Sequence, residues 1–450
     1  MGAVAGLALV NIEDHLSQFL ARHPDGRLRV GFSGGRDSTV LLAALARLPQ
    51  ARARDLLAVH VNHGLHAEAA QWAAHALAIA GQLGVRCEVD RVQVLERTEV
   101  GLEAKARAAR REAYSHHLDP GDWMLLAHHQ RDQAETVMLR LLAGAGPRGL
   151  AAMAEVSELP PGRIGRPLLQ ATDAQMQASI EAAELPWVED PANADHQHER
   201  SWLRASIMPP LRQRKPSIDQ HLARLADWQR ELSAGLSRQA AALLIERRDA
   251  NGSLRLENWA ALPEPLRFEL LCAWLASHGQ PRAGRVLFER FEIELVAARG
   301  DAEPSLQCHG GWLRRYRQHA FWMSADGSGA QRPEPGAPLP AYGRLGAPLV
   351  VAEHQLLSQS EPGCSAALPT GTAFRIDLRR GGERLRPAHD RPTRGLKTLL
   401  QEQGIPPWQR QRLWLLWTGN ELAAVLDPDS GSVLLQTPRL QGWRLRIVRR

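Results

Sequence analysis

A short stretch near the N-terminus carries residue types that together can bind the phosphates of a nucleotide. Residues 33–38 read Ser-Gly-Gly-Arg-Asp-Ser and follow an alternating apolar pattern over residues 28–32 that predicts a strand. Gly34 and Gly35 can adopt positive φ and bring backbone N–H groups close to a ligand, and the two serines add hydroxyl donors. The apolar run that follows predicts a helix, whose first N–H groups lie at the loop. We therefore predict a phosphate site, without the lysine of a Walker loop.

A second polar stretch follows the next predicted strand. His60, Asn62 and His63 carry imidazole and amide groups, which can hydrogen-bond or stack on an adenine without adding a fixed charge. Histidines at 60, 63 and 66 also permit a zinc site, but no cysteine or carboxylate lies nearby in the sequence. This stretch is therefore better explained as a loop over the nucleotide.

A third stretch, residues 128–136, reads His-His-Gln-Arg-Asp-Gln-Ala-Glu-Thr and opens a predicted helix. One interpretation makes Asp132 the N-cap of this helix and Glu135 its capping-box partner. The other places His129, Asp132 and Glu135 in one opening above the sheet, where they contribute to a reaction. The sequence leaves both interpretations open.

The predicted helix around residues 101–111 carries cations on consecutive turns. It could be a solvated face with an ion pair between Glu103 and Arg107, four residues apart. Alternatively, Glu103 orients a substrate amine while Arg107 or Arg110 faces phosphate. Composition does not decide between these alternatives.

The elements that position these residues alternate between strand and helix up to about residue 145. Such alternation predicts an α/β fold, a doubly wound parallel sheet covered on both faces. Ligands of such sheets bind beyond the carboxyl ends of the strands, where the loops at 33–38, 60–66 and 128–135 all fall. The fold therefore predicts that the three stretches meet.

Length and composition set the domain organisation. A chain of 450 residues is too long for one ordinary core. We predict a nucleotide-binding catalytic domain over residues 1–214, a helical substrate-binding domain over 215–335 and a small α+β domain over 336–450. A segment rich in proline and glycine, residues 327–340, predicts the second linker.

Charge and cysteine content narrow the class of protein. The balance of 55 Lys and Arg against 49 Asp and Glu gives a net charge of +6, which fits a polyanionic partner or a mildly basic solvated surface. The apolar start is short and soon followed by acidic residues, so we expect neither a signal peptide nor a membrane span. Four scattered cysteines favour neither a disulfide framework nor a metal knuckle, and a reducing cytoplasm is expected.

Taken in order, the motifs resemble one family. SGGRDS, HVNHGL, GLEAKARAAR, AHHQRDQAET, RLLAGAGPRGL and LPWVEDPANAD resemble the tRNA(Ile)-lysidine synthetases of the PP-loop ATP pyrophosphatase superfamily, and GLKTLLQEQGIPPWQRQR resumes the resemblance near the C-terminus. The resemblance implies an adenine nucleotide alpha hydrolase-like first domain and the long form with C-terminal tRNA-binding domains. Each motif is weak alone, but the ordered set is specific.

The resemblance also implies a reaction. Lysine is joined to C2 of the wobble cytidine of a CAU-anticodon tRNA(Ile), through an adenylated tRNA, while ATP becomes AMP and pyrophosphate. ATP and Mg²⁺ are the implied cofactors, tRNA(Ile) and free L-lysine the partners, and a homodimer is left open. The alternatives are another PP-loop enzyme such as a tRNA thiolase, which commonly uses paired cysteines, or an inactive RNA-binding module.

The resemblance assigns site residues where the motifs of this sequence match those of the family. The implied catalytic residues are Asp37, Asp132, Glu135 and Arg204, and Asp37 is the expected Mg²⁺ ligand. The predicted ATP-binding residues are Ser33, Gly34, Gly35, Arg36, Asp37, Ser38, His60, Asn62 and His63. The predicted residues for lysine are Glu103, Arg107, Arg110, His129, Asp132 and Glu135.

Two positions depart from the family pattern. Arg131 stands where the family usually has the first of two adjacent aspartates, and Ser201 stands where it usually has asparagine. Arg131 reverses a charge beside the predicted site, which is the best support for the inactive alternative.

The C-terminal region concentrates cations between residues 375 and 412, beside an aromatic residue. This surface is either solvated or a platform for the tRNA backbone, and we favour the platform. The predicted tRNA contacts are Arg391, Arg394, Lys397, Trp408 and Arg410.

Overall fold

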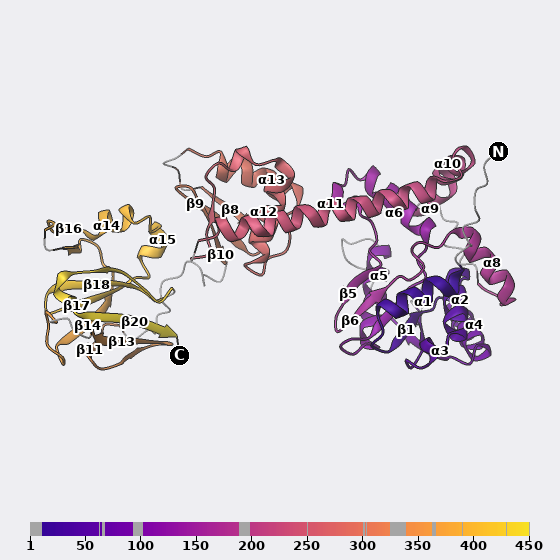
Figure 1. The fold of residues 1–450 in the computed structure, drawn as a ribbon, viewed down its shortest axis with the longest axis horizontal. Helices are drawn as coiled ribbons and strands as arrows, with labels where there is room; N and C mark the ends of the chain where they lie inside the picture. Colours follow the sequence, from indigo (N-terminus) through magenta and orange to yellow (C-terminus); the bar gives the residue numbers. More distant parts are fainter. Residues whose placement is uncertain are drawn as a thin grey trace. The chain divides into compact units, whose positions relative to one another are not determined.

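The computed structural model (Figure 1) describes the chain from residue 11 to 449, apart from residues 63, 65–67, 93–101, 189–198, 250, 300–301, 303, 325–338, 362–365, 389 and 429. It divides into two compact units, Met1–Gly235 and Leu236–Arg450. We describe each unit by itself. Within the described ranges, no helix combines the length and the apolar composition needed to cross a membrane.

The first unit is built on a six-stranded sheet of order β3-β2-β1-β4-β6-β5. Its strands are β1 (Leu28–Gly31), β2 (Leu57–Asn62), β3 (Arg86–Arg91), β4 (Trp123–Leu125), β5 (Val156–Leu159) and β6 (Gly162–Gly165). The neighbouring strands β3, β2, β1, β4 and β6 pair in parallel, and only the edge strand β5 runs antiparallel to its neighbour β6. The predicted α/β class with a mostly parallel sheet is confirmed.

Helices cover both faces of this sheet. Neighbouring residues of each strand face opposite ways, and both faces carry apolar side chains that the helices bury. Ala58 packs with the core on one face, whereas Leu57 and Val59 pack on the other. The first face is covered by α1 (Ile12–Arg22), α2 (Arg36–Arg47), α4 (Ala69–Gln82) and α8 (Asp173–Ala183). The second face is covered by α5 (Leu102–His116), which contributes Tyr114. Because β1, β2 and β4 run parallel, the loops that follow them lie at the same edge of the sheet, as predicted.

Further helices complete the first unit. They are α3 (Pro49–Arg52), α6 (Gln130–Leu142), α7 (Pro147–Leu150), α9 (Glu199–Trp202), the π-helix η2 (Leu203–Ile207) and α10 (Met208–Arg214). The 30-residue helix α11 (Ile218–Arg247) begins here and contains the boundary between the two units.

The second unit starts with helices around a small antiparallel sheet. Its four strands lie in the order β7-β10-β9-β8. They are β7 (Leu254–Arg255), β8 (Ser305–Cys308), β9 (Gly311–Tyr316) and β10 (His319–Ser324), packed with η3 (Trp259–Ala261), α12 (Glu264–Ala276), α13 (Arg285–Arg290) and the π-helix η4 (Phe291–Val296). The sequence predicted a mostly helical region here and missed the sheet, whose strands are only two to six residues long.

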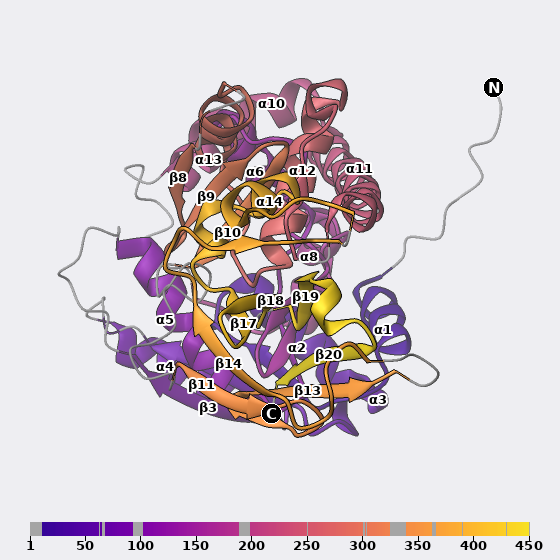
Figure 2. The same cartoon turned by 90° about the vertical axis from the view of Figure 1, so that its left-hand side faces the viewer.

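The rest of the second unit is α+β, as predicted. Figure 2 labels the strands of a five-stranded sheet of order β11-β14-β17-β18-β19. A three-stranded sheet accompanies it, in which β13 pairs with β12 and β20. The strands are β11 (Ala341–Arg344), β12 (Leu349–Val351), β13 (His354–Ser360), β14 (Ala373–Leu378), β17 (Trp414–Thr418), β18 (Glu421–Asp427), β19 (Ser432–Gln436) and β20 (Trp443–Arg449). The pair β15 (Arg384–Leu385) and β16 (Arg394–Gly395), the helices α14 (Leu396–Glu402) and α15 (Pro407–Arg410), and the turn η5 (Pro438–Leu440) complete it.

Candidate active site

The predicted phosphate loop lies between the end of β1 and the start of α2. Gly34 has a φ of +81°, a conformation that residues with a side chain rarely adopt. Gly35 is the N-cap of α2 and has no side chain to satisfy the first N–H groups of the helix. The hydroxyls of Ser33 and Ser38 lie 3.0 Å apart and close the loop. The loop therefore presents donors to an anion at the positive end of a helix.

Asp37, in the first turn of α2, is tied to a carboxylate far away in the sequence. Arg36 donates from Nε to Asp37 Oδ1 at 2.8 Å and from Nη2 to Asp173 Oδ1 at 2.8 Å. Asp173 is the first residue of α8. Arg36 thus links the phosphate loop to α8.

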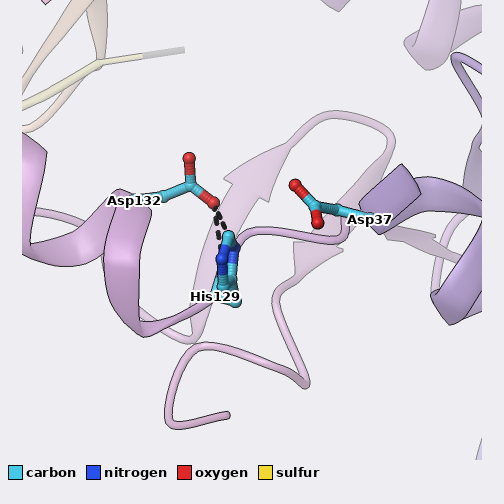
Figure 3. A group of neighbouring side chains, drawn as sticks. All are labelled: Asp37, His129 and Asp132. Carbon is cyan, nitrogen blue, oxygen red and sulfur yellow. Dashed lines mark hydrogen bonds and ion pairs between the residues drawn. The ribbon is translucent and has the colours of Figure 1, made fainter. Parts of the chain in front are cut away.

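His129 and Asp132 form a buried ion pair at the start of α6. The ring Nδ1 of His129 lies 2.7 Å from Asp132 Oδ2, and the backbone N–H of His129 donates to the same oxygen at 3.1 Å. Figure 3 shows Asp132 and Asp37 on either side of His129. The N-cap of α6 is therefore His129, and Asp132 is the third helical residue. The interpretation that made Asp132 the N-cap and Glu135 its capping-box partner is wrong by three positions.

The charges of this pair stabilise one another. Burial alone would lower the pKa of His129, but the hydrogen bond to Asp132 and the nearby charge of Asp173 raise this pKa to about 9. Burial alone would raise the pKa of Asp132, but its bond to His129 and the charge of Arg200 hold this pKa well below the usual range. His129 is therefore an imidazolium at neutral pH.

Glu135 is fully buried and held by arginines. Its side chain has 0 % exposure, and Arg204 donates to both of its oxygens, at 3.0 and 2.7 Å. Arg200 donates to Glu135 at 3.4 Å and to Asp132 at 2.9 Å. The hydrogen bond to Glu135 raises the pKa of Arg204, so its charge is permanent. Both oxygens of Glu135 are therefore engaged inside the protein.

A π-helical turn brings these arginines to the carboxylates. Pro209 and Pro210 have no backbone N–H to continue the α-helical pattern, and the N–H of Met208 bonds five residues back, to Leu203 O. Leu203 is fully buried against Ala134 of α6. The same turn that buries Leu203 directs Arg204 toward Glu135.

The residues predicted to contact adenine lie at the end of β2. His60 is buried, its Nδ1 lies 2.9 Å from Phe32 O, and burial lowers its pKa. Asn62 donates to Ala69 O and accepts from Gly64 N, so its amide holds the loop. His63 lies outside the described residues.

The cationic helix is α5. Arg107 and Arg110 are exposed on it. Arg110 is close enough to His60 for its charge to contribute to the lowered pKa of that histidine. The side chain of Glu103 lies outside the described residues, so its predicted role in lysine binding stays a prediction.

The predicted tRNA contacts fall in the second unit. Arg391 and Lys397 are exposed, and Arg394 pairs with Glu402. Arg410, by contrast, is 5 % exposed and donates to the hydroxyl of Tyr316.

Trp408 is also engaged inside the second unit. Its ring packs edge-on against Tyr316 and Phe321, and Arg314 lies over it. We therefore leave Trp408 and Arg410 out of the proposed tRNA surface.

Three residues near the site were missed by the sequence reasoning. Arg200 opens the Arg-x-x-x-Arg pair that ends in Arg204, and this spacing was the available signal. Asp173 had no signal beyond its place at a helix start. His75 of α4 faces the loop: a Cβ added to Gly34 would lie 3.5 Å from its ring.

Several nitrogen atoms at this place are buried without a hydrogen-bond partner among the described residues. They are His75 Nε2, His128 Nδ1, His129 Nε2 and Arg131 Nε. Unpaired buried polar atoms are costly, and the nitrogens of protonated His129 and of Arg131 can only donate, which fits an anionic ligand.

The donor set also fits a divalent cation. One ligand atom each from Asp37, His129 and Asp132 lies within 4.8 Å of the others. Carboxylate oxygens are the ligands that Mg²⁺ prefers, whereas the bond of His129 Nδ1 to Asp132 leaves the imidazole a supporting role.

Comparison with known proteins agrees with this geometry. Residues 8–211 match the family model of the PP-loop domain. Fold and site thus define an ATP-using enzyme of the PP-loop class. Residues 254–321 match the model of the TilS substrate binding domain, and residues 374–447 match that of the TilS substrate C-terminal domain.

Full-length relatives give the family. The tRNA(Ile)-lysidine synthase of Alkalilimnicola ehrlichii is 38 % identical over 433 residues, which cover 95 % of each chain. That of Pseudomonas aeruginosa is 40 % identical over 458 residues, covering 97 % of each chain. The chain belongs to the tRNA(Ile)-lysidine synthase family, and it is an ATP-dependent ligase. The resemblance found in the sequence is confirmed, and the alternative of a tRNA thiolase is set aside. The domain boundaries at 214 and 335 remain predictions.

Proposed function

We propose that the first unit binds ATP with its phosphates on residues 33–38 and its adenine toward the end of β2. The bare N-terminus of α2, the positive φ of Gly34 and the unpartnered nitrogens of His75, His129 and Arg131 support this placement. Among the residues of the site that the structure describes, cations also outnumber carboxylates, as a polyanion requires. The cations are Arg36, Arg131, Arg200, Arg204 and protonated His129, and the carboxylates are Asp37, Asp132, Glu135 and Asp173.

Asp37 and Asp132 are the residues proposed to hold Mg²⁺. When bound, it would neutralise charge on the pyrophosphate leaving group. Asp132 is already ionised, because His129 and Arg200 stabilise its carboxylate, so a metal would not have to displace a proton.

The proposed substrates are a tRNA(Ile) with the anticodon CAU and free L-lysine. In the first step, the C2 oxygen of the wobble cytidine attacks the α-phosphorus of ATP, and the bond to the bridging oxygen breaks, which releases pyrophosphate. In the second step, the neutral ε-amine of lysine attacks C2, and the C2–O bond breaks, which releases AMP. The cytidine oxygen leaves within AMP, and the amine gives up its protons to the site and solvent.

The arginines and carboxylates take different parts in these steps. Arg200 and Arg204 would stabilise the charge that develops on the α-phosphate, since they are fixed donors in a partly buried site. Glu135 holds Arg204 in place. Lysine has a reference pKa near 10.4 and must lose a proton to attack. Asp132 is the better candidate to hold its ammonium group, because it retains 9 % exposure whereas Glu135 has none.

One observation supports this proposal above the others: the segments after β1 and β4 bring one ligand atom each of Asp37, His129 and Asp132 to within 4.8 Å of one another. The test is product analysis with ATP, Mg²⁺, lysine and the cognate tRNA, which should yield AMP and pyrophosphate. Asp37→Ala should lower this rate ~100-fold or more, while Glu112→Gln on the exposed face of α5 serves as the control. ADP and phosphate as products would refute the proposal.

A further inference from the structure

Arg131, which stands where the family usually has an aspartate, has an acidic partner in the fold. Its Nη1 lies 3.3 Å from Asp173 Oδ2, across 42 residues of sequence. The two side chains are partly buried, with 31 % and 41 % of their surface exposed. The arginine of α6 is thus paired with the first residue of α8.

The same Asp173 is shared by the phosphate loop. Arg36 donates to its other oxygen, Oδ1, at 2.8 Å, while Arg36 also holds Asp37. Nε2 of His129, whose ring is 97 % buried, lies 3.6 Å from Oδ1 and has no hydrogen-bond partner. Asp173 therefore joins the loop that holds the phosphates to the start of the helix that carries Asp132.

The signs of these charges depend on one another. Removing the carboxylate at 173 would leave Arg36 and Arg131 near one another without their shared anion. An aspartate at 131 would instead face the carboxylate of Asp173 and compete with it for Arg36. Two carboxylates facing each other in this partly buried site repel one another, whereas the observed pair attracts.

We propose that Arg131 and Asp173 act as one positioning pair, which holds Arg36 and His129 in the geometry that receives ATP. Arg131 is then a compensated substitution and not the mark of an inactive site. An aspartate at 131 is compatible with activity when residue 173 is neutral or cationic. The inference rests on the proposed ATP site and adds two residues to it.

A double-mutant cycle tests the pair. The proteins are the wild type, Arg131→Asp, Asp173→Asn and the double variant, and the readouts are the Kd for ATP by calorimetry and kcat/KM for ATP. Arg131→Asp should weaken ATP binding about tenfold although it restores the usual family residue, because attraction becomes repulsion. Asp173→Asn in the same chain removes the repulsion, so the double variant should bind ATP no more weakly than Asp173→Asn alone.

Matched variants separate positioning from folding. Arg140→Asp makes the same charge change at an exposed residue of the same helix and should leave the Kd unchanged. Arg131→Lys should retain most of the affinity, and Arg131→Gln should lose less than Arg131→Asp because it adds no repulsion. Thermal unfolding of each variant shows that the fold persists.

Two results would overturn the inference. One is an Arg131→Asp variant that binds ATP as tightly as the wild type or more tightly. The other is a double variant whose loss is the product of the two single losses, since independent residues behave in this way. Failure of the wild type to form AMP and pyrophosphate would instead refute the proposed function. The four Kd values for ATP would still test whether Arg131 and Asp173 act as a pair.

Discussion

Replacing Glu135 with glutamine should destabilise the first unit and slow the chemistry without weakening lysine binding. Glutamine keeps the size of the side chain but puts an amide donor against the donors of Arg204 and Arg200, which lie 2.7–3.4 Å from the carboxylate oxygens. Breaking a buried ion pair costs about 3–5 kcal/mol. The two arginines are 27 % and 37 % exposed, so we expect the low end of that range, about 3 kcal/mol.

The assay is thermal unfolding of the full chain together with steady-state kinetics. For a unit of this size, about 3 kcal/mol corresponds to a fall in Tm of roughly 6–12 °C. Glu112→Gln, at an exposed position, should leave Tm within about 2 °C. A Tm near that of the wild type would refute the role of Glu135 in holding Arg204. A selective rise in KM for lysine would show instead that Glu135 binds the substrate ammonium.

Two further predictions concern pH and tRNA. Without Mg²⁺, the wild type should exceed His129→Asn in stability by up to about 3 kcal/mol below pH ~6.5, because the pKa of His129 is raised to about 9 in the fold. This advantage should disappear as pH rises through 9. It should also shrink below pH ~4, where Asp132 binds a proton in the unfolded chain while its lowered pKa keeps it ionised in the fold. Urea unfolding at several pH values measures it. Reversing Arg391 and Lys397 to glutamate should weaken tRNA binding and flatten its salt dependence by about one log unit per lost phosphate contact, while Arg86→Glu in the first unit should not. An unchanged salt slope would mean that the basic surface is only solvated.

Local patterns made the phosphate loop predictable. A strand, two glycines and a helix start lie within about ten residues of one another, and their geometry follows from backbone preferences. The start of α6 was harder, because a capping box shifts the helix boundary and Asp132 serves both the cap and the site. Boundaries that depend on such side-chain bonds cannot be settled by hydrophobic periodicity.

Long-range contacts account for what the sequence did not reveal. Arg36 meets Asp173 across 137 residues, and Arg200 meets Glu135 across 65, so neither pair has a local signal. Trp408 lies among cations in the sequence, a pattern typical of a nucleic-acid surface. In the fold its ring packs inside the second unit, because tertiary contacts outweigh local composition.

The most direct test of the account is transfer of labelled lysine to tRNA. With ATP and Mg²⁺, the enzyme should attach radiolabelled lysine to a tRNA(Ile) transcript whose anticodon is CAU, with one AMP formed for each lysine. The attached lysine should be found on the wobble base, and a transcript with uridine at that position should stay unlabelled. Absence of label in the CAU transcript, in a preparation that binds ATP and this tRNA, would contradict the account.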